Sequence, residues 1–247
     1  MAQPLYLYGI FPAPGPSHLE ISGLDDQPVA THLIEEFAFL YSPAQQTRYL
    51  ASRKNLLGHE RVLEAAMQQG DRTLLPLQFG LVIETWERVR QELIDPHGDG
   101  LKRLFSKLNG HREVSVKVLW QPDQELNQLM AENDALRQER DRLEGQPLSM
   151  DQVVTIGQAI EQAVEGRKEG IINAFRETLN PFAIDVAENT PLTDTMIYNA
   201  AYLIPWEAEP EFGREIEAID AQFEDRLRIR YNNFTAPFNF AQLDRLG

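Results

Sequence analysis

The sequence predicts an α+β protein with two domains. Residues 1–110 are expected to form an N-terminal domain in which two helices cover a mixed sheet, and residues 111–232 a ferredoxin-like βαββαβ sandwich with an inserted helical arm at 123–147. Residues 233–247 would form an aromatic C-terminal tail. Three observations support this prediction: apolar residues alternate near the start of each half, long segments have the period of amphipathic helices, and the turn dipeptide Asn109-Gly110 separates the halves.

The N-terminal domain is expected to begin with a strand at residues 5–11, because the prolines and the glycine of residues 12–16 favour a loop. Apolar residues at helical spacing predict a helix over about residues 51–69, which Gly70 and Asp71 end. The other expected elements are strands at residues 19–21, 29–40 and 73–81, and a second helix from about Thr85 to Leu108, interrupted at Asp95-Pro96-His97-Gly98.

The C-terminal domain is expected to open with a strand at residues 111–120, in which valines alternate with polar residues. A long helix over about residues 153–179 contains Gly157, Gly166 and Gly170, which are tolerated where a helix bends or packs closely on a sheet. Strands at residues 182–186, 195–204 and 226–231 and a helix at residues 210–223 complete the βαββαβ order.

The inserted arm has a weak heptad pattern. Leu129, Leu136 and Leu143 recur every seven residues, while Asn133 and Arg140 occupy the alternate seam positions. Gly145-Gln146-Pro147 should end this helix, and Ser149 with Gln152 has the spacing of a capping box for a returning helix. We therefore favour an intramolecular helical hairpin, and an intermolecular coiled coil is the alternative.

Composition limits the class of protein. The chain has 247 residues, no cysteine and a formal net charge of −15, with 13 acids and 10 bases up to residue 110 and 25 acids and 13 bases beyond it. This balance argues against binding of nucleic acid or an anionic lipid membrane. Because signal-peptide and membrane-spanning patterns are absent from the sequence, we expect a cytoplasmic protein.

Five segments, in order, resemble the F/L family of gas vesicle proteins, and most closely its cyanobacterial F type. They are Leu5 to Ile10 (LYLYGI), Tyr49 to Val82 (with GHE and LLPLQFG), His111 to Trp120 (HREVSVKVLW), Ala200 to Ile204 (AAYLI) and Arg228 to Phe240 (RIRYNNFTAPFNF). Members usually end in a Gly-Pro-Trp-Pro-Pro-like run, whereas this chain has Thr235-Ala236-Pro237-Phe238.

The resemblance implies a structural or binding protein of gas vesicles. Its implied partners are the major gas vesicle shell protein, which is hydrophobic, and other accessory gas vesicle proteins; its implied location is the gas vesicle. A protein of this kind could cover the apolar surface of shell subunits before assembly, while an acidic surface keeps the complex dispersed. Two alternatives stay open: a component that remains in the vesicle and a chaperone-like adaptor that leaves.

Two groups of residues are candidates for partner binding. Arg48, Arg53 and Lys54, with Arg61 nearby, form the most basic cluster of an acidic chain; they could form ion pairs along the helix or dock an acidic partner. The second group is the aromatic tail, whose residues either pack back onto a domain, which we favour, or engage another protein. Its candidate residues are Phe234, Pro237, Phe238 and Phe240.

The sequence does not indicate an enzyme. His59-Glu60 begins like a zinc-protease helix, but Leu63 occupies the position of the second histidine. Glu35 and Glu36 would face opposite ways in a strand and could not act together as acid and base. We therefore expect no catalytic residue, metal or cofactor, and the contrasting hypothesis is a small-molecule enzyme with its site in a groove between the domains.

Overall fold

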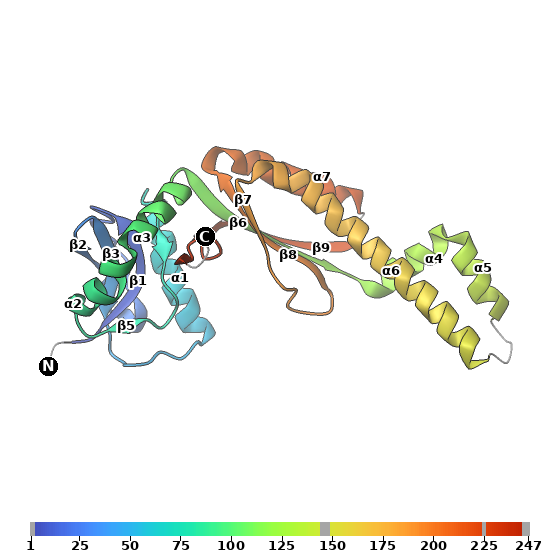
Figure 1. Ribbon diagram of the computed structural model, residues 1–247, viewed down its shortest axis with the longest axis horizontal. Coiled ribbons are helices and arrows are strands. Elements are labelled where there is room, and N and C mark those ends of the chain that lie inside the picture. The colour runs from blue at the N-terminus through green and yellow to red at the C-terminus, as the bar shows by residue number, and fades with distance from the viewer. Residues whose placement is uncertain (1–2, 144–148, 224–225, 244–247) are drawn as a thin grey trace. The chain divides into compact units, whose positions relative to one another are not determined.

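The computed structural model describes residues 3–143, 149–223 and 226–243 (Figure 1). The fold is α+β, with two sheets and helices. The chain divides into two compact units: unit 1 comprises Met1–Val114, Tyr202–Glu207 and Asn232–Gly247, and unit 2 comprises Ser115–Ala201 and Ala208–Tyr231. In the part of the chain that the structure describes, no helix is long and apolar enough to span a membrane.

Unit 1 contains an antiparallel sheet, so the expectation of a mixed sheet is wrong. Its strands follow the order β2-β3-β1-β4, and β5 also pairs with β1; every pairing is antiparallel. A tight hairpin joins β2 to β3, which makes these neighbours antiparallel. The strands are β1 Leu5–Pro12, β2 Ala30–Ile34, β3 Phe37–Pro43, β4 Leu75–Pro76 and β5 Val82–Ile83.

Three strand predictions in unit 1 need correction. Residues 29–40 form two strands, because Glu35 adopts a φ of 55° and turns the chain with Glu36. Residues 19–21 are not a strand, and residues 73–81 contain only the two-residue β4. Pro76 has no N–H to donate and Gly80 has a φ of 91°, which together prevent a longer strand here.

Helices cover both faces of this sheet. α1 (Arg53–Gln68) confirms the helix predicted from residue 51, and its Val62 and Leu63 share one core cluster with Tyr6 and Tyr8 of β1. On the other face Phe105 of α3 lies against the Phe37 ring, with 6.2 Å between ring centroids. The interruption expected at residues 95–98 is instead a π-helical turn at Arg90–Ile94, which joins α2 (Trp86–Val89) to α3 (Asp95–Leu108).

Unit 2 is built around a sheet with the strand order β7-β8-β6-β9, and β6, β8 and β9 each continue at one end into unit 1. Helices α6 and α7 lie on one face of it (Figure 1). The bounds are β6 His111–Trp120, α6 Met150–Leu179, β7 Asp185–Glu188, β8 Met196–Pro205, α7 Glu209–Gln222 and β9 Leu227–Thr235. Short 3₁₀ turns lie at Asn180–Phe182 after α6 and at Trp206–Ala208 before α7, and a third lies at Leu24–Asp26 in unit 1. Gly157, Gly166 and Gly170 have nothing within 4 Å of an added Cβ; close packing on the sheet therefore does not explain them.

The arm is a hairpin within the chain, as favoured, but its first limb is not one helix. α4 (Pro122–Glu132) ends at Asn133, whose φ of −104° and ψ of 88° break the helix, and α5 (Asp134–Leu143) follows. The Asn133 Oδ1 atom accepts a hydrogen bond from Leu136 N at 3.0 Å, so this residue caps α5 rather than filling a coiled-coil seam. Both α4 and α5 contact α6. The capping box at Ser149 is confirmed, and Gly145-Gln146-Pro147 lies outside the described residues.

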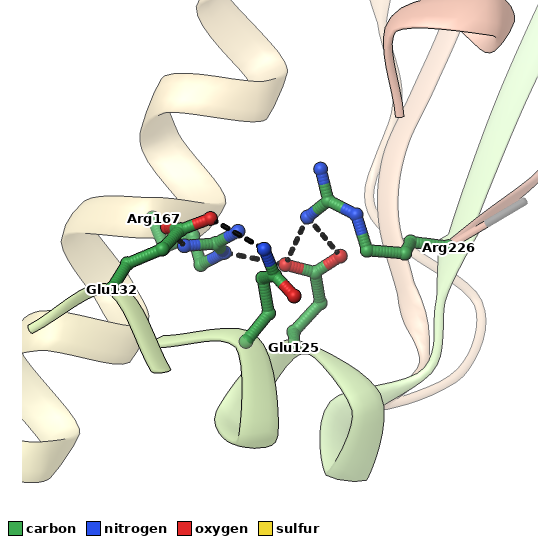
Figure 2. Close-up of polar contacts among 5 residues, drawn as sticks. Glu125, Glu132, Arg167 and Arg226 are labelled. Carbon is green, nitrogen blue, oxygen red and sulfur yellow. Dashed lines mark hydrogen bonds and ion pairs between the residues drawn. The ribbon is translucent and has the colours of Figure 1, made fainter. Parts of the chain in front are cut away.

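A buried ion cluster fixes the base of the arm (Figure 2). The Glu125 carboxylate of α4 accepts from Arg167 Nε of α6 at 2.5 Å and from Arg226 Nη1 at 2.9 Å. Its side chain is 1% exposed, so both guanidinium groups compensate a charge that water does not reach. Arg167 also donates to Glu132, and that bond extends the cluster along α4.

Candidate functional site

The basic cluster predicted at the start of α1 is fully on the surface. Arg48, Arg53 and Lys54 are exposed, and they form no ion pair with any residue that the structure describes. Ser52 caps the helix, since its Oγ accepts from Asn55 N at 3.3 Å. Ion pairs along the helix, which were the alternative role considered for these cations, are therefore not formed by Arg48, Arg53 or Lys54 with the described residues.

Two of these cations lie where a positive charge is unfavourable for the helix. The N-terminal end of a helix carries partial positive charge and favours acids in its first turn. The first turn of α1 contains no acid, and it carries Arg53 and Lys54. A local conflict of this kind is expected where a surface serves binding rather than folding.

Three leucines are exposed among the same residues. Leu50 is 76% exposed, Leu56 40% and Leu57 46%. Single exposed leucines are ordinary, but three beside free cations provide both an apolar contact area and a charge of one sign. We name Arg48, Leu50, Arg53, Lys54, Leu56 and Leu57 the basic–leucine surface.

A groove of about 570 Å³ borders this surface. One wall carries Lys54 and Arg61 of α1, and the opposite wall carries Glu20, Asp25 and Asp26. Gly58 permits the close approach of the walls, because a Cβ there would lie 2.9 Å from Leu24 Cδ2. A partner that enters this groove would meet cations on one side and carboxylates on the other.

Three buried tyrosines hold the loops around this region. Each hydroxyl accepts a backbone N–H: Tyr6 from Gly80 at 3.0 Å, Tyr8 from Leu24 at 2.8 Å and Tyr49 from Gln45 at 3.1 Å. Tyr49 in turn donates to Asp25 Oδ2 at 2.9 Å, which fixes that wall of the groove. The tyrosine-rich first strand therefore acts as a loop anchor.

His59 is part of this anchor. Its Nδ1 atom lies 2.9 Å from the Tyr6 hydroxyl oxygen. Because that oxygen already accepts from Gly80, we assign the hydroxyl proton to the Tyr6–His59 bond, which makes His59 the neutral Nε2–H tautomer. Burial lowers the pKa of His59 to about 4. No group of three or more histidine and acidic side chains among the described residues could hold a metal ion.

The aromatic tail packs back onto unit 1, as favoured. Phe240 is 1% exposed and Pro237 is buried. Phe238 is half-buried against the His59 ring, at 6.4 Å between centroids, and Phe234 lies 6.3 Å from Trp206. Arg72 and Arg112 lie over the ring of Trp206 at 4.5 and 4.4 Å. Only the half-buried Phe234 and Phe238 retain exposed surface for a partner, and Arg48, Arg53 and Lys54 remain the better candidates.

A buried carboxylate, which sequence reasoning missed, fastens the tail. Glu113 of β6 is 3% exposed and accepts from Asn239 N at 2.9 Å and from Asn239 Nδ2 at 2.7 Å. Burial raises the pKa of Glu113 to about 7, although both hydrogen bonds from Asn239 act in the opposite direction. Glu113 lies in the polar phase of its strand, so alternation predicted exposure and gave no signal for this role.

The comparisons with known proteins identify the family. A family model described as gas vesicle synthesis protein GvpL/GvpF matches residues 4–242. The chain belongs to this family. It is 55% identical to gas vesicle protein F of Dolichospermum flosaquae, over 99% of this chain and 100% of the relative, and 56% identical to gas vesicle protein F of Microcystis aeruginosa, over 97% and 98%. The GvpF crystal structure from Anabaena sp. PCC7120 has a TM-score of 0.85 at 51% identity and covers 98% of this chain and 97% of that one. The resemblance drawn from five sequence segments is confirmed.

Proposed function

We propose that this GvpL/GvpF family member is a non-enzymatic minor component or assembly factor of gas vesicles. It binds the hydrophobic shell subunit and other accessory gas vesicle proteins, in the cytoplasm and at the vesicle, and it binds neither nucleic acid nor lipid. The observation that supports it best is the basic–leucine surface at the start of α1, where exposed leucines lie beside cations that form no ion pair with a described residue.

The mechanism is coverage of an apolar partner. Leu50, Leu56 and Leu57 supply apolar contact, which is worth roughly 25 cal/mol per Å² buried. Arg48, Arg53 and Lys54 select partners that also carry carboxylates, because charges across an interface determine which partner is accepted and how fast it associates. The net charge of −15 keeps the loaded complex dispersed.

We also propose where the domains of this protein begin and end. The order β7-β8-β6-β9 with α6 and α7 supports a ferredoxin-like sandwich over residues 111–232, with the arm at 123–147 inserted before α6. Residues 1–110 then form the domain that carries the basic–leucine surface, and the tail at 233–247 belongs functionally to that domain.

The experiment is capture of purified shell subunit on immobilised protein at moderate salt. The proposal predicts retention by the wild type and loss in Arg48→Glu/Arg53→Glu/Lys54→Glu. Arg88→Glu/Arg90→Glu/Arg103→Glu is the control with an equal charge change elsewhere in unit 1. Direct binding through this surface is contradicted if the wild type retains no shell subunit, or if the two triple variants retain equal amounts of it.

A second measurement separates a resident component from a transient adaptor. Intact vesicles are washed and probed with an antibody against this protein. Signal that persists after washing identifies a component of the finished vesicle. Loss of the signal, with capture of the shell subunit still positive, identifies an assembly factor that leaves.

A further inference from the structure

Strand β9 forms one edge of the sheet in unit 2, since it pairs only with β6 in the described strand order. Its Tyr231 ring lies 5.9 Å from Phe212 of α7, so Leu227, Ile229 and Tyr231 point toward the helices. Arg228 and Arg230 therefore point to the opposite face, and both are exposed.

A third cation lies on that face. On the neighbouring β6, Trp120 lines a pocket with Glu165 and Lys168 of α6, so the even-numbered residues of β6 face the helices. Lys117 then faces the same way as Arg228 and Arg230. None of these three cations makes an ion pair with a residue that the structure describes. We name Lys117, Arg228 and Arg230 the basic sheet face.

This charge distribution is unusual for the chain. Residues beyond 110 carry 25 acids against 13 bases, yet the sheet face next to the outer edge of β9 carries cations. In many proteins, charged residues on an edge strand have no role other than to prevent aggregation through that edge. Lysine is the usual guard of an edge strand, whereas this strand carries two arginines. The planar guanidinium group binds carboxylates with two parallel hydrogen bonds, so the choice of arginine favours attraction of an opposite charge.

We propose that β9 binds an extended acidic protein segment, which adds to the sheet as a further strand. Backbone hydrogen bonds to the outer edge of β9 would align the segment, and its carboxylates at alternate positions would face Arg228 and Arg230. The intervening side chains would be apolar, because they extend the row of Ile229 and Tyr231, which are only half-buried. The recognised pattern is acid–apolar–acid–apolar, and this inference does not rest on the proposed function.

The test uses a nine-residue peptide of alternating glutamate and valine with blocked ends, titrated into the full-length protein. We expect binding, and slower hydrogen exchange of the amides of residues 228–231 in the complex. The double variant Arg228→Glu/Arg230→Glu should bind the glutamate–valine peptide with an affinity at least about tenfold lower. The same variant should bind the matching lysine–valine peptide, which the wild type is not expected to bind. Arg214→Glu on α7 is the control, because Arg214 is exposed on the helical side, and it should change affinity less than about twofold.

Other outcomes overturn the proposal. Equal binding by the wild type and the double variant, or protection elsewhere than β9, would remove the edge strand as the site. If the glutamate peptide does not bind while Arg228→Ala/Arg230→Ala aggregates, the arginines only guard the edge. Concentration-dependent self-association that the double variant abolishes would assign the edge to a second copy of this chain, and displacement of the peptide by a single-stranded oligonucleotide would assign it to nucleic acid.

Discussion

The Glu113 carboxylate accepts two hydrogen bonds from Asn239, a residue 126 positions further along the chain, and this pair fastens the C-terminal tail to unit 1. The Glu113 side chain is almost fully buried. The sequence around Glu113 or Asn239 has no pattern that predicts this contact. The pair gives the tail a defined place, so its phenylalanines act first as core residues.

Glu113→Gln should change the pH dependence of stability. The pKa of Glu113 is raised from 4.5 to about 7 in the folded state, so the wild type gains stability as pH falls from about 7 to 4.5, by an amount of the order of 3 kcal/mol. Glutamine resembles the neutral acid. Its Oε1 atom can still accept from the Asn239 backbone N–H, and its Nε2 atom can donate to Asn239 Oδ1 once the Asn239 side-chain amide turns over. The free energy of unfolding of Glu113→Gln minus that of the wild type should therefore be positive at pH 8, clearly smaller at pH 5 and near zero at pH 4. A difference independent of pH contradicts this reading.

His59→Asn should show the opposite sign. The pKa of His59 is lowered from 6.5 to about 4, so its stabilising contribution is complete above pH 6.5 and is lost as pH falls toward 4. The asparagine Oδ1 atom can take the place of Nδ1 as acceptor for Tyr6. Urea unfolding at pH 7.5 and at pH 4.5 should therefore show a smaller advantage of the wild type over His59→Asn in acid, and an advantage that grows there would refute the assignment.

Glycine-to-alanine substitutions should separate free from constrained glycines. Alanine at 157, 166 or 170 meets no atom within 4 Å and should stabilise α6 by up to about 1 kcal/mol each. Alanine at Gly23 would place its Cβ 2.1 Å from the Tyr8 hydroxyl oxygen and should destabilise unit 1. Thermal unfolding of the four variants checks both signs. Destabilisation by all three α6 substitutions would show that these glycines have a packing role.

Glu125→Gln should loosen the arm. The substitution leaves Arg167 and Arg226 facing a neutral amide, and breaking a buried ion pair costs about 3–5 kcal/mol. Glu132→Gln removes a half-exposed partner of Arg167 and should cost less than about 1 kcal/mol. Hydrogen exchange of the α4 amides should accelerate only in Glu125→Gln. Equal protection in the two variants would mean that apolar contacts alone hold α4 in place.

Periodicity predicted the elements that follow one rule over many residues. α1, β6 and α6 were placed close to their observed bounds because each carries a long stripe with a single period, and the capping box at Ser149 is a local pattern. The failures are local backbone events. A left-handed φ at Glu35 split one expected strand, and an Asn133 cap split one expected helix. Neither event changes the apolar pattern that the prediction used.

Of the candidate site, the sequence predicted the exposed residues but not the buried hydrogen bonds that position the surrounding loops. The sequence drew attention to Arg48, Arg53 and Lys54 by charge alone, and to the tail by its phenylalanines. Glu125 left a detectable signal, because a carboxylate falls in the apolar phase with Leu129 and Met130. The tyrosine bonds to the backbone of distant loops left none, since they depend on tertiary placement of residues up to 74 positions apart.

We propose that this protein acts on gas vesicle formation through the basic–leucine surface. The most direct measurement is the number of gas vesicles seen by electron microscopy in a vesicle-forming host whose own copy is replaced by Leu50→Ser/Leu56→Ser/Leu57→Ser. Leu33→Ser/Leu192→Ser, which changes exposed leucines elsewhere, is the control. We predict that the triple variant accumulates as folded protein but yields few vesicles, while the control matches the wild type. Wild-type vesicle numbers in the triple variant would show that the three leucines are not needed for vesicle formation and would rule out this surface as the site of action.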